Sequence, residues 1–205
     1  GVMGLAGPSA NQFGRVSPTT AAHVQDEFGA DLLILDGGAC AVGIESTIVD
    51  CTRGAPVLLR PGAIGLAQLA SAAGQPVLTA LPASAQAPAP RASGTLLAHY
   101  APRAKLRLMD KQALQTALDM LGTDVAPAAK GPVIATYSRS ALRSGSSGVV
   151  QRRMPDDAGA TAQQLFAVLR GFDDQGVKLI WVESPPDGPQ WDGVRDRLQR
   201  AAAAD

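Results

Sequence analysis

Three polar clusters in the first half of the chain have residue types suited to binding a phosphate-bearing ligand. In the first, Ser9, Asn11 and Ser17 surround Gly14 on a predicted loop that leads into a helix. Hydroxyls, amides and the free N–H groups of a helix N-terminus are common partners of phosphate oxygens. A purely structural interpretation is also open, in which Ser17 caps the helix and Asn11 closes a turn.

The second cluster is a glycine-rich loop that enters a predicted strand at Ser46. Gly38 and Gly43 have the spacing that begins a Walker A motif, but Lys and Ser or Thr are required where this chain has Ile44 and Glu45. A P-loop is therefore excluded. What remains is a loop whose backbone can approach a ligand closely, or, equally well, a plain turn with Glu45 in solvent.

The third cluster combines one arginine with an aromatic pair. Arg60 ends a predicted apolar strand, at the edge where α/β sheets usually bind ligands, and its guanidinium matches phosphate geometry. The alternative is a surface arginine whose stem lies along apolar groups. His99 and Tyr100 stand in an otherwise featureless connector, where a ring either stacks on a base, folds back onto the first domain or anchors the connector by apolar contact.

The elements that must position these residues are those of an α/β protein. In the first part, Ser17-Pro18 predicts the start of a helix over residues 18–28 that stops at Gly29. Short apolar or β-branched runs predict strands at 32–35, 46–50 and 57–60, and residues 64–73 predict a second helix. An edge strand at residues 2–6 is a further expectation.

The second part alternates strands and helices, as in a small parallel sheet with crossover helices. Strands are predicted at 106–109, 133–137, 149–153 and 177–183, and amphipathic helices at 111–121, 161–172 and 193–203. Trp181 and Trp191 are expected in the core of this part or at its edge. Between the parts, a Pro/Ala/Ser-rich stretch predicts a linker, so the expected domains are 1–80 and 104–205, joined by 81–103.

Composition removes several classes of function. Lys+Arg and Asp+Glu are both 18, so no global charge attracts nucleic acid or an anionic membrane. Residues 61–90 carry no charge, but prolines and glycines break that stretch as a membrane span, and residues 1–7 do not resemble a signal peptide. Two cysteines, Cys40 and Cys51, fit reduced thiols in a cytoplasmic protein better than disulfides or a zinc site.

Six motifs follow one another in the order found in the Sua5/YciO/YrdC family, and the chain resembles its two-domain threonylcarbamoyl-AMP synthases. The motifs are Pro8-Ser9-Ala10-Asn11, Gly14-Arg-Val-Ser17-Pro18-Thr19-Thr20, Leu35-Asp36-Gly37-Gly38, Gly43-Ile-Glu-Ser46-Thr47-Ile48-Val49-Asp50, Leu59-Arg60-Pro61-Gly62 and His99-Tyr100-Ala101-Pro102. More loosely, the second half resembles the family's small Rossmann-like domain. The resemblance implies the C-terminal part of a YrdC-like twisted-sheet domain, a linker and that Rossmann-like domain.

The activity that the resemblance implies is that of a nucleotidyltransferase. L-Threonine, bicarbonate and ATP, the last with Mg²⁺, give L-threonylcarbamoyladenylate and pyrophosphate. The adenylate would pass to a complex that transfers the threonylcarbamoyl group to adenosine 37 of tRNA. By motif, Ser9, Asn11, Ser17, Arg60 and Tyr100 resemble ATP contacts and Ser46 a threonine contact, and no residue resembles a metal ligand.

One family feature is absent from the part of the chain before residue 104, which resembles the catalytic domain. The resemblance implies a catalytic Lys-x-Arg motif, whereas the first lysine of this chain is Lys105. We therefore expect an incomplete fragment of the catalytic domain with little or no turnover, and no catalytic residue is assigned. The alternative is a non-catalytic nucleotide-binding or regulatory remnant of the same family.

Overall fold

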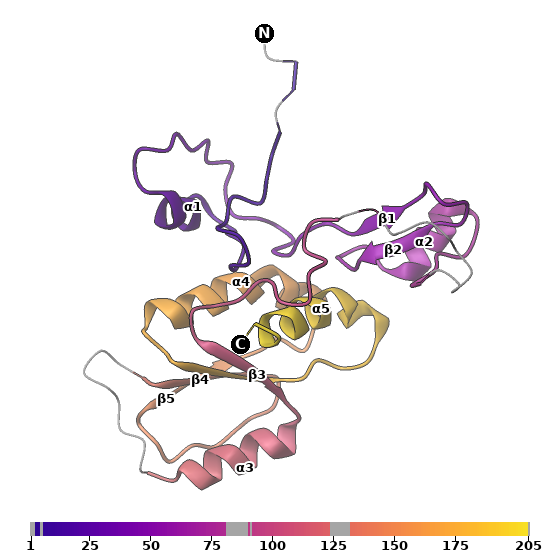
Figure 1. Cartoon of the computed structure of the whole chain (residues 1–205). Coiled ribbons are helices and arrows are strands. Elements are labelled where there is room, and N and C mark those ends of the chain that lie inside the picture. The colour runs from indigo at the N-terminus through magenta and orange to yellow at the C-terminus, as the bar shows by residue number, and fades with distance from the viewer. Residues whose placement is uncertain (1–2, 5, 81–89, 91, 124–131, 205) are drawn as a thin grey trace.

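A four-stranded parallel sheet in the second half of the chain organises the fold of this computed structural model (Figure 1). The structure describes residues 3–4, 6–80, 90, 92–123 and 132–204. In spatial order the strands are β3 (Lys105–Met109), β6 (Leu179–Glu183), β4 (Ile134–Ser138) and β5 (Val149–Arg153), all parallel. Each lies within two residues of its predicted range, so the predicted α/β fold is confirmed.

Helices cover both faces of this sheet. The helix α3 (Lys111–Leu121) lies on one face, and α4 (Ala158–Asp174), the short helix η1 (Pro189–Trp191) and α5 (Asp192–Ala202) lie on the other (Figure 1). Asp110 and Asp157 begin α3 and α4 by accepting backbone N–H bonds at 2.8 and 2.7 Å. The bounds of α3 are those predicted, and the bounds of α4 and α5 differ from the predicted ones by up to three residues.

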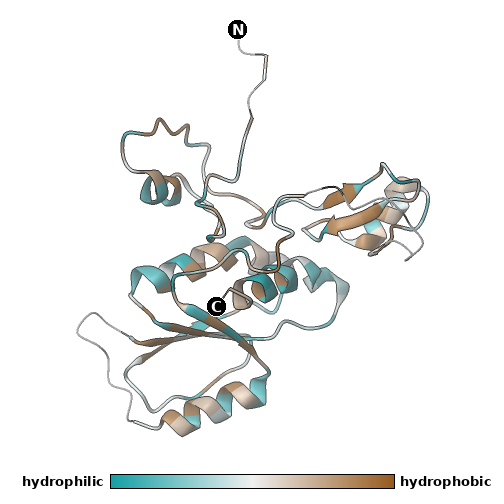
Figure 2. Ribbon diagram, in the orientation of Figure 1, coloured by the Kyte–Doolittle hydropathy of each residue, from teal (hydrophilic) through white to brown (hydrophobic). Residues whose placement is uncertain are grey.

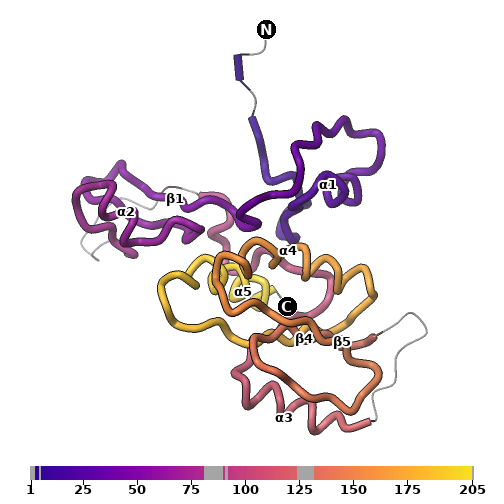
Figure 3. Tube along the Cα trace, turned by 180° about the vertical axis from the view of Figure 1, so that it is seen from behind, coloured from indigo at the N-terminus to yellow at the C-terminus, as the bar shows by residue number. Residues whose placement is uncertain are grey.

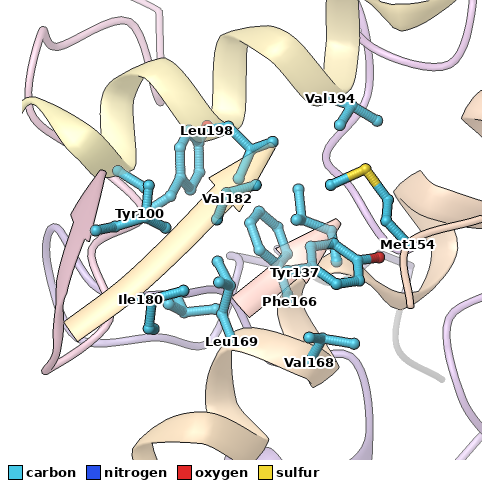
Figure 4. Packing of buried hydrophobic residues seen from close by; sticks show 14 of the residues in the cluster. Tyr100, Tyr137, Met154, Phe166, Val168, Leu169, Ile180, Val182, Val194 and Leu198 are labelled. Carbon is cyan, nitrogen blue, oxygen red and sulfur yellow. The ribbon is translucent and has the colours of Figure 1, made fainter. Parts of the chain in front are cut away.

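The core follows from the alternation of side chains along each strand. In β6, Ile180 and Val182 pack toward α4 and α5, while Trp181 packs toward α3. Figure 4 shows the larger cluster, and Figure 2 shows the strands as mostly apolar. Trp181 and Trp191 are 8% and 3% exposed, so their predicted place in the second domain is confirmed.

The first part of the chain forms only small elements. β1 (Ile48–Asp50) and β2 (Val57–Arg60) make an antiparallel pair, followed by α2 (Leu66–Ala73), and α1 (Ala21–Phe28) stands apart from them (Figure 1). Leu78 forms a single bridge beside Val57. No described helix of the chain is long and apolar enough to cross a membrane.

The strand predicted at 32–35 is wrong. That segment forms no strand, and Leu33 and Leu35 are 85% and 83% exposed. An apolar run forms a strand only beside a pairing strand, and no described strand pairs with this one. The described residues of the proposed edge strand, 3, 4 and 6, are not extended into a strand either, and residues 1, 2 and 5 lie outside the described chain.

The predicted start of α1 is also wrong. Ser17 does not cap it; the N-cap is Thr20, whose hydroxyl accepts the N–H of His23 at 3.2 Å. The hydroxyl of Ser17 is engaged by a distant residue, described below, so it is not available to the helix. The predicted stop at Gly29 is confirmed, with a φ of 85°.

Loops of the first part pack on α4 and α5, on the side away from the sheet (Figures 1 and 3). Val16, Ile44 and Tyr100 belong to the same apolar cluster as these helices. Gly43 sits so close that an added Cβ would lie 2.3 Å from the carbonyl oxygen of Gln163 in α4. Part of the predicted linker, residues 81–89 and 91, lies outside the described chain, and the predicted domain bounds stay a prediction.

Candidate functional site

Ser9 and Asn11 form a turn of their own near the start of the described chain. The Ser9 hydroxyl donates to Asn11 Oδ1 at 2.5 Å, and Asn11 Nδ2 donates to the carbonyls of Gln12 and Arg15, each at 3.0 Å. The turn-closing role considered for Asn11 therefore exists in the fold. Within the described chain, no side-chain hydrogen bond joins these two residues to the other predicted site residues, and their contact with ATP stays a prediction.

Ser17 is buried and bonded to Glu45. Its hydroxyl donates to Glu45 Oε1 at 2.5 Å, across a separation of 28 residues. The backbone beside Ser17 is held as well, because Arg170 of α4 donates to the carbonyls of Val16 and Ser17 and pairs with Glu27 of α1 at 2.6 Å. The loop that ends at Ser17 is thus fixed both to the glycine-rich loop and to the second domain.

Glu45 is not in solvent, which corrects the plain-turn interpretation of its loop. Its second carboxylate oxygen accepts Arg197 Nε at 2.7 Å, and its carbonyl oxygen accepts Arg197 Nη2 at 3.1 Å. Arg197 Nη1 also donates to the carbonyl of Pro61 and to Asp196, both at 2.8 Å. The Arg197 side chain is 0% exposed, so its charge is compensated entirely by these partners.

Arg60 and Ser46 are brought together by the pairing of β1 with β2. Arg60 Nε donates to the Ser46 carbonyl at 3.0 Å, and Nη2 lies 3.4 Å from the Ser46 hydroxyl. Nη1 donates to the carbonyl of Ser93 at 2.9 Å, so the guanidinium also holds the connector. Arg60 is 6% exposed, which excludes the surface-arginine interpretation, whereas Ser46 is exposed.

Tyr100 is buried in the apolar cluster between α4 and α5, as Figure 4 shows. Its ring stacks on Phe166 with centroids 5.6 Å apart, and the Arg197 guanidinium lies 5.1 Å from its centroid. This matches the interpretation in which the aromatic pair anchors the connector. Burial raises the pKa of the Tyr100 hydroxyl, and that hydroxyl has no hydrogen-bond partner within the described chain.

The Tyr100 hydroxyl also lies close to Arg60, and the backbone of Gly94 packs against both side chains. A Cβ added at Gly94 would lie 1.9 Å from Tyr100 Oη and 3.1 Å from Arg60 Nη1. Only glycine fits here, since its φ of 72° is in the left-handed region and no side chain has room. Ser46, Arg60 and Tyr100 are therefore neighbours, and Ser17 joins them through Glu45 and Arg197.

This group contains residue types that bind oxygen-rich anions. Arg60 supplies a guanidinium, and Ser46 and Tyr100 supply hydroxyls, whereas Arg197 and the Ser17 hydroxyl are already bonded to Glu45. No group of three or more His, Cys, Asp or Glu in the described chain can hold a metal ion. A cavity of about 550 Å³ lies beside it, between residues 41–68 and the starts of α4 and α5, and none of the predicted site residues line it.

Sequence reasoning missed Glu45 and Arg197 as members of this group. For Glu45 the sequence indicates only a ligand-approaching loop or a turn with the carboxylate in solvent, and neither interpretation includes a buried partner. Arg197 lies on the same face of α5 as Val194, Leu198 and Ala201, all of them buried. An arginine in the apolar stripe of an amphipathic helix is a signal of buried pairing that sequence alone carries.

Comparisons with known proteins agree with this architecture. The family model described as "Threonylcarbamoyl-AMP synthase, C-terminal domain" matches residues 64–203, and the Sua5/YciO/YrdC model, described as "Telomere recombination", matches residues 2–62. Threonylcarbamoyl-AMP synthases of Bacillus subtilis strain 168 and Schizosaccharomyces pombe are each 32% identical over 97% of this chain. A crystal structure of Pyrococcus abyssi Sua5 complexed with L-threonine aligns with 96% of this chain at 26% identity and a TM-score of 0.74.

The comparisons also show how much of each relative's length this chain covers. It covers 57% of the Bacillus protein, 52% of the Schizosaccharomyces protein and 57% of the Pyrococcus crystal structure. The chain thus spans about half the length of the curated relatives that it matches.

Proposed function

Because the chain belongs to the family of the threonylcarbamoyl-AMP synthases, we propose that it serves the synthesis of L-threonylcarbamoyladenylate from L-threonine, bicarbonate and ATP. Such a reaction makes the protein a nucleotidyltransferase and releases pyrophosphate. The observation that supports the proposal most is the match to curated synthases over 97% of the chain. The proposed product would pass to a complex that modifies adenosine 37 of tRNA.

The grouped side chains support a role for this chain in holding the nucleotide. We assign ATP contacts to Ser9, Asn11, Ser17, Arg60 and Tyr100, and a threonine contact to Ser46. In the proposed reaction, the carboxylate of N-carboxythreonine attacks the α-phosphorus and pyrophosphate leaves. Guanidinium and hydroxyl donors already fixed in place would stabilise the negative charge that develops on the phosphate oxygens.

Magnesium belongs to this proposal as part of the substrate. Mg²⁺ bound to the phosphates of ATP would shield the leaving pyrophosphate, so the protein need only hold the Mg–ATP complex. We also propose a cytoplasmic location, which is supported by the two free and exposed thiols, Cys40 and Cys51.

Two measurements test the function. Isothermal titration calorimetry with Mg–ATP measures nucleotide binding, and release of pyrophosphate measures turnover. Release that requires both L-threonine and bicarbonate supports the synthase. Binding of Mg–ATP without release supports the second candidate, a nucleotide-binding unit without turnover. Absence of Mg–ATP binding refutes both.

A further inference from the structure

Arg197 is a residue of the second domain whose partners in the first part of the chain lie next to the proposed substrate contacts. It donates to the carboxylate oxygen Oε2 and to the backbone carbonyl of Glu45, the residue before Ser46. It also donates to the carbonyl of Pro61, the residue after Arg60. Its guanidinium also lies over the ring of Tyr100. One buried side chain therefore contacts three segments that are far apart in the sequence.

The geometry of the contacts requires arginine. The acceptors lie in different directions around one planar group, and a guanidinium presents its donors as a rigid fork that a lysine ammonium cannot reproduce. The Ser17 hydroxyl depends on the same arrangement, because it donates to the Glu45 oxygen that Arg197 leaves free. The orientations of these site residues thus all depend on Arg197, which contacts Tyr100 directly and the others through Glu45 and Pro61. The residues are Ser17, Ser46, Arg60 and Tyr100.

Two other residues of α5, Asp196 and Arg200, link Arg197 to the connector. Asp196 accepts from Arg197 at 2.8 Å and from Arg200 at 2.9 Å, and Arg200 in turn donates to the carbonyl of Leu96. The connector is therefore held on α5 at Leu96 through the Arg200 side chain, at His99 through the Arg200 carbonyl and at Tyr100 through Arg197.

We propose that Arg197 is a positioning residue, through which the second domain sets the geometry of the nucleotide and threonine contacts. The inference rests on the proposed function for its ligands, but the orientation of the loops can be measured without them. It gives the accessory domain a defined part in the site, beyond packing against it.

The test compares Arg197→Met with Arg195→Met, a matched variant on the same helix. Arg195 pairs with Asp187, Asp192 and the carbonyl of Gly188, all within the second domain. In calorimetry with Mg–ATP, Arg197→Met is expected to weaken binding at least tenfold and Arg195→Met less than twofold. Equal effects of the two variants would overturn the inference.

A double variant separates positioning from stability. Arg197→Met leaves the partly buried Glu45 carboxylate unpaired and is expected to lower the melting temperature, whereas adding Glu45→Gln removes that charge and should restore it. The double variant is nevertheless expected to keep the tenfold loss of Mg–ATP affinity, because nothing then orients the loops. Recovery of affinity together with stability would assign Arg197 a purely structural role and overturn the inference.

Amide hydrogen exchange tests the positioning role of Arg197 without any nucleotide, and therefore independently of the proposed function. Amide exchange at residues 45–47, 60 and 62 is expected to accelerate at least tenfold in Arg197→Met and to stay unchanged in Arg195→Met. Unchanged exchange in Arg197→Met overturns the positioning inference even where Mg–ATP binds. A wild-type chain that binds no Mg–ATP refutes the proposed function, and the exchange experiment still decides whether Arg197 orients the loops.

Discussion

Replacement of Gly43 by alanine should separate the glycine-rich loop from the second domain. Gly43 has a φ of 83°, and Gly54 has a φ of 86°, so alanine meets similar backbone strain at both positions. The surroundings differ, because a Cβ at Gly43 would lie 2.3 and 2.4 Å from two carbonyl oxygens of α4, whereas a Cβ at Gly54 has nothing within 4 Å. Gly54→Ala is therefore the matched control for Gly43→Ala.

The magnitudes follow from this difference. The left-handed conformation costs an alanine about 1–2 kcal/mol at either position. At Gly43 the backbone of α4 cannot give way, so the loop must move out, and Ile44, now 9% exposed, loses its burial. Burial of an isoleucine is worth about 1.5–3 kcal/mol. The expected loss of unfolding free energy is thus about 2.5–5 kcal/mol for Gly43→Ala and about 1–2 kcal/mol for Gly54→Ala.

Urea unfolding followed by circular dichroism measures both free energies. A second readout, amide exchange at residues 43–47, should accelerate in Gly43→Ala alone. If the two variants lose equal stability and exchange at equal rates, the loop is not packed against α4 as described, and the reasoning fails.

Three further predictions concern the second domain and the connector. Burial alone would raise the pKa of Glu183, but hydrogen bonds from Ser138 and its neighbours hold that pKa below its usual value. The stability that these hydrogen bonds supply is therefore complete above the unfolded-state pKa of Glu183. It is lost as pH falls through the folded-state pKa. Ser138→Ala should accordingly cost about 1.5–3 kcal/mol at pH 7 and much less in acid, and a cost that does not change with pH in urea titrations would contradict this. Phe166→Ala removes a core ring that also stacks on Tyr100 and should cost about 3–5 kcal/mol, against no more than about 0.5 kcal/mol for Met120→Ala on the exposed face of α3; similar losses in thermal unfolding would be evidence against the described core. Tyr100→Phe removes a buried hydroxyl that lacks a partner in the described chain, so it should raise the unfolding free energy by about 1 kcal/mol, and a loss of stability would show that the hydroxyl is bonded.

Local patterns predicted the second domain well. The strands are apolar runs, and α3 begins at an aspartate cap and ends before a glycine, so each boundary is encoded within a few residues of itself. The first part depends on partners that are distant in the sequence. Ser17-Pro18 has a good helix-start pattern, but Glu45 takes the Ser17 hydroxyl and Thr20 becomes the cap. Residues 32–35 have the composition of a strand and lack a pairing strand in the described chain.

The candidate site shows the same division. The types and positions of Ser46 and Arg60 mark them as candidates in the sequence. They meet because Ser46 lies just before β1, and β1 pairs antiparallel with β2, which ends at Arg60. The bond between Glu45 and Arg197 crosses 152 residues, and no local pattern specifies which acidic residue a buried arginine will find. The arginine on the buried face of α5 was visible in the sequence, whereas its partner was not.

The order of strands in the parallel sheet determines when this domain can fold during synthesis. β6 is the last strand made, yet it lies between β3 and β4 and is the only described strand that pairs with β3. As the ribosome proceeds, β4 and β5 can pair early, but β3 has to wait for a strand about 70 residues further on. The contacts of Arg197 form later still, so the loops of the proposed site acquire their final arrangement only after α5 has left the exit tunnel.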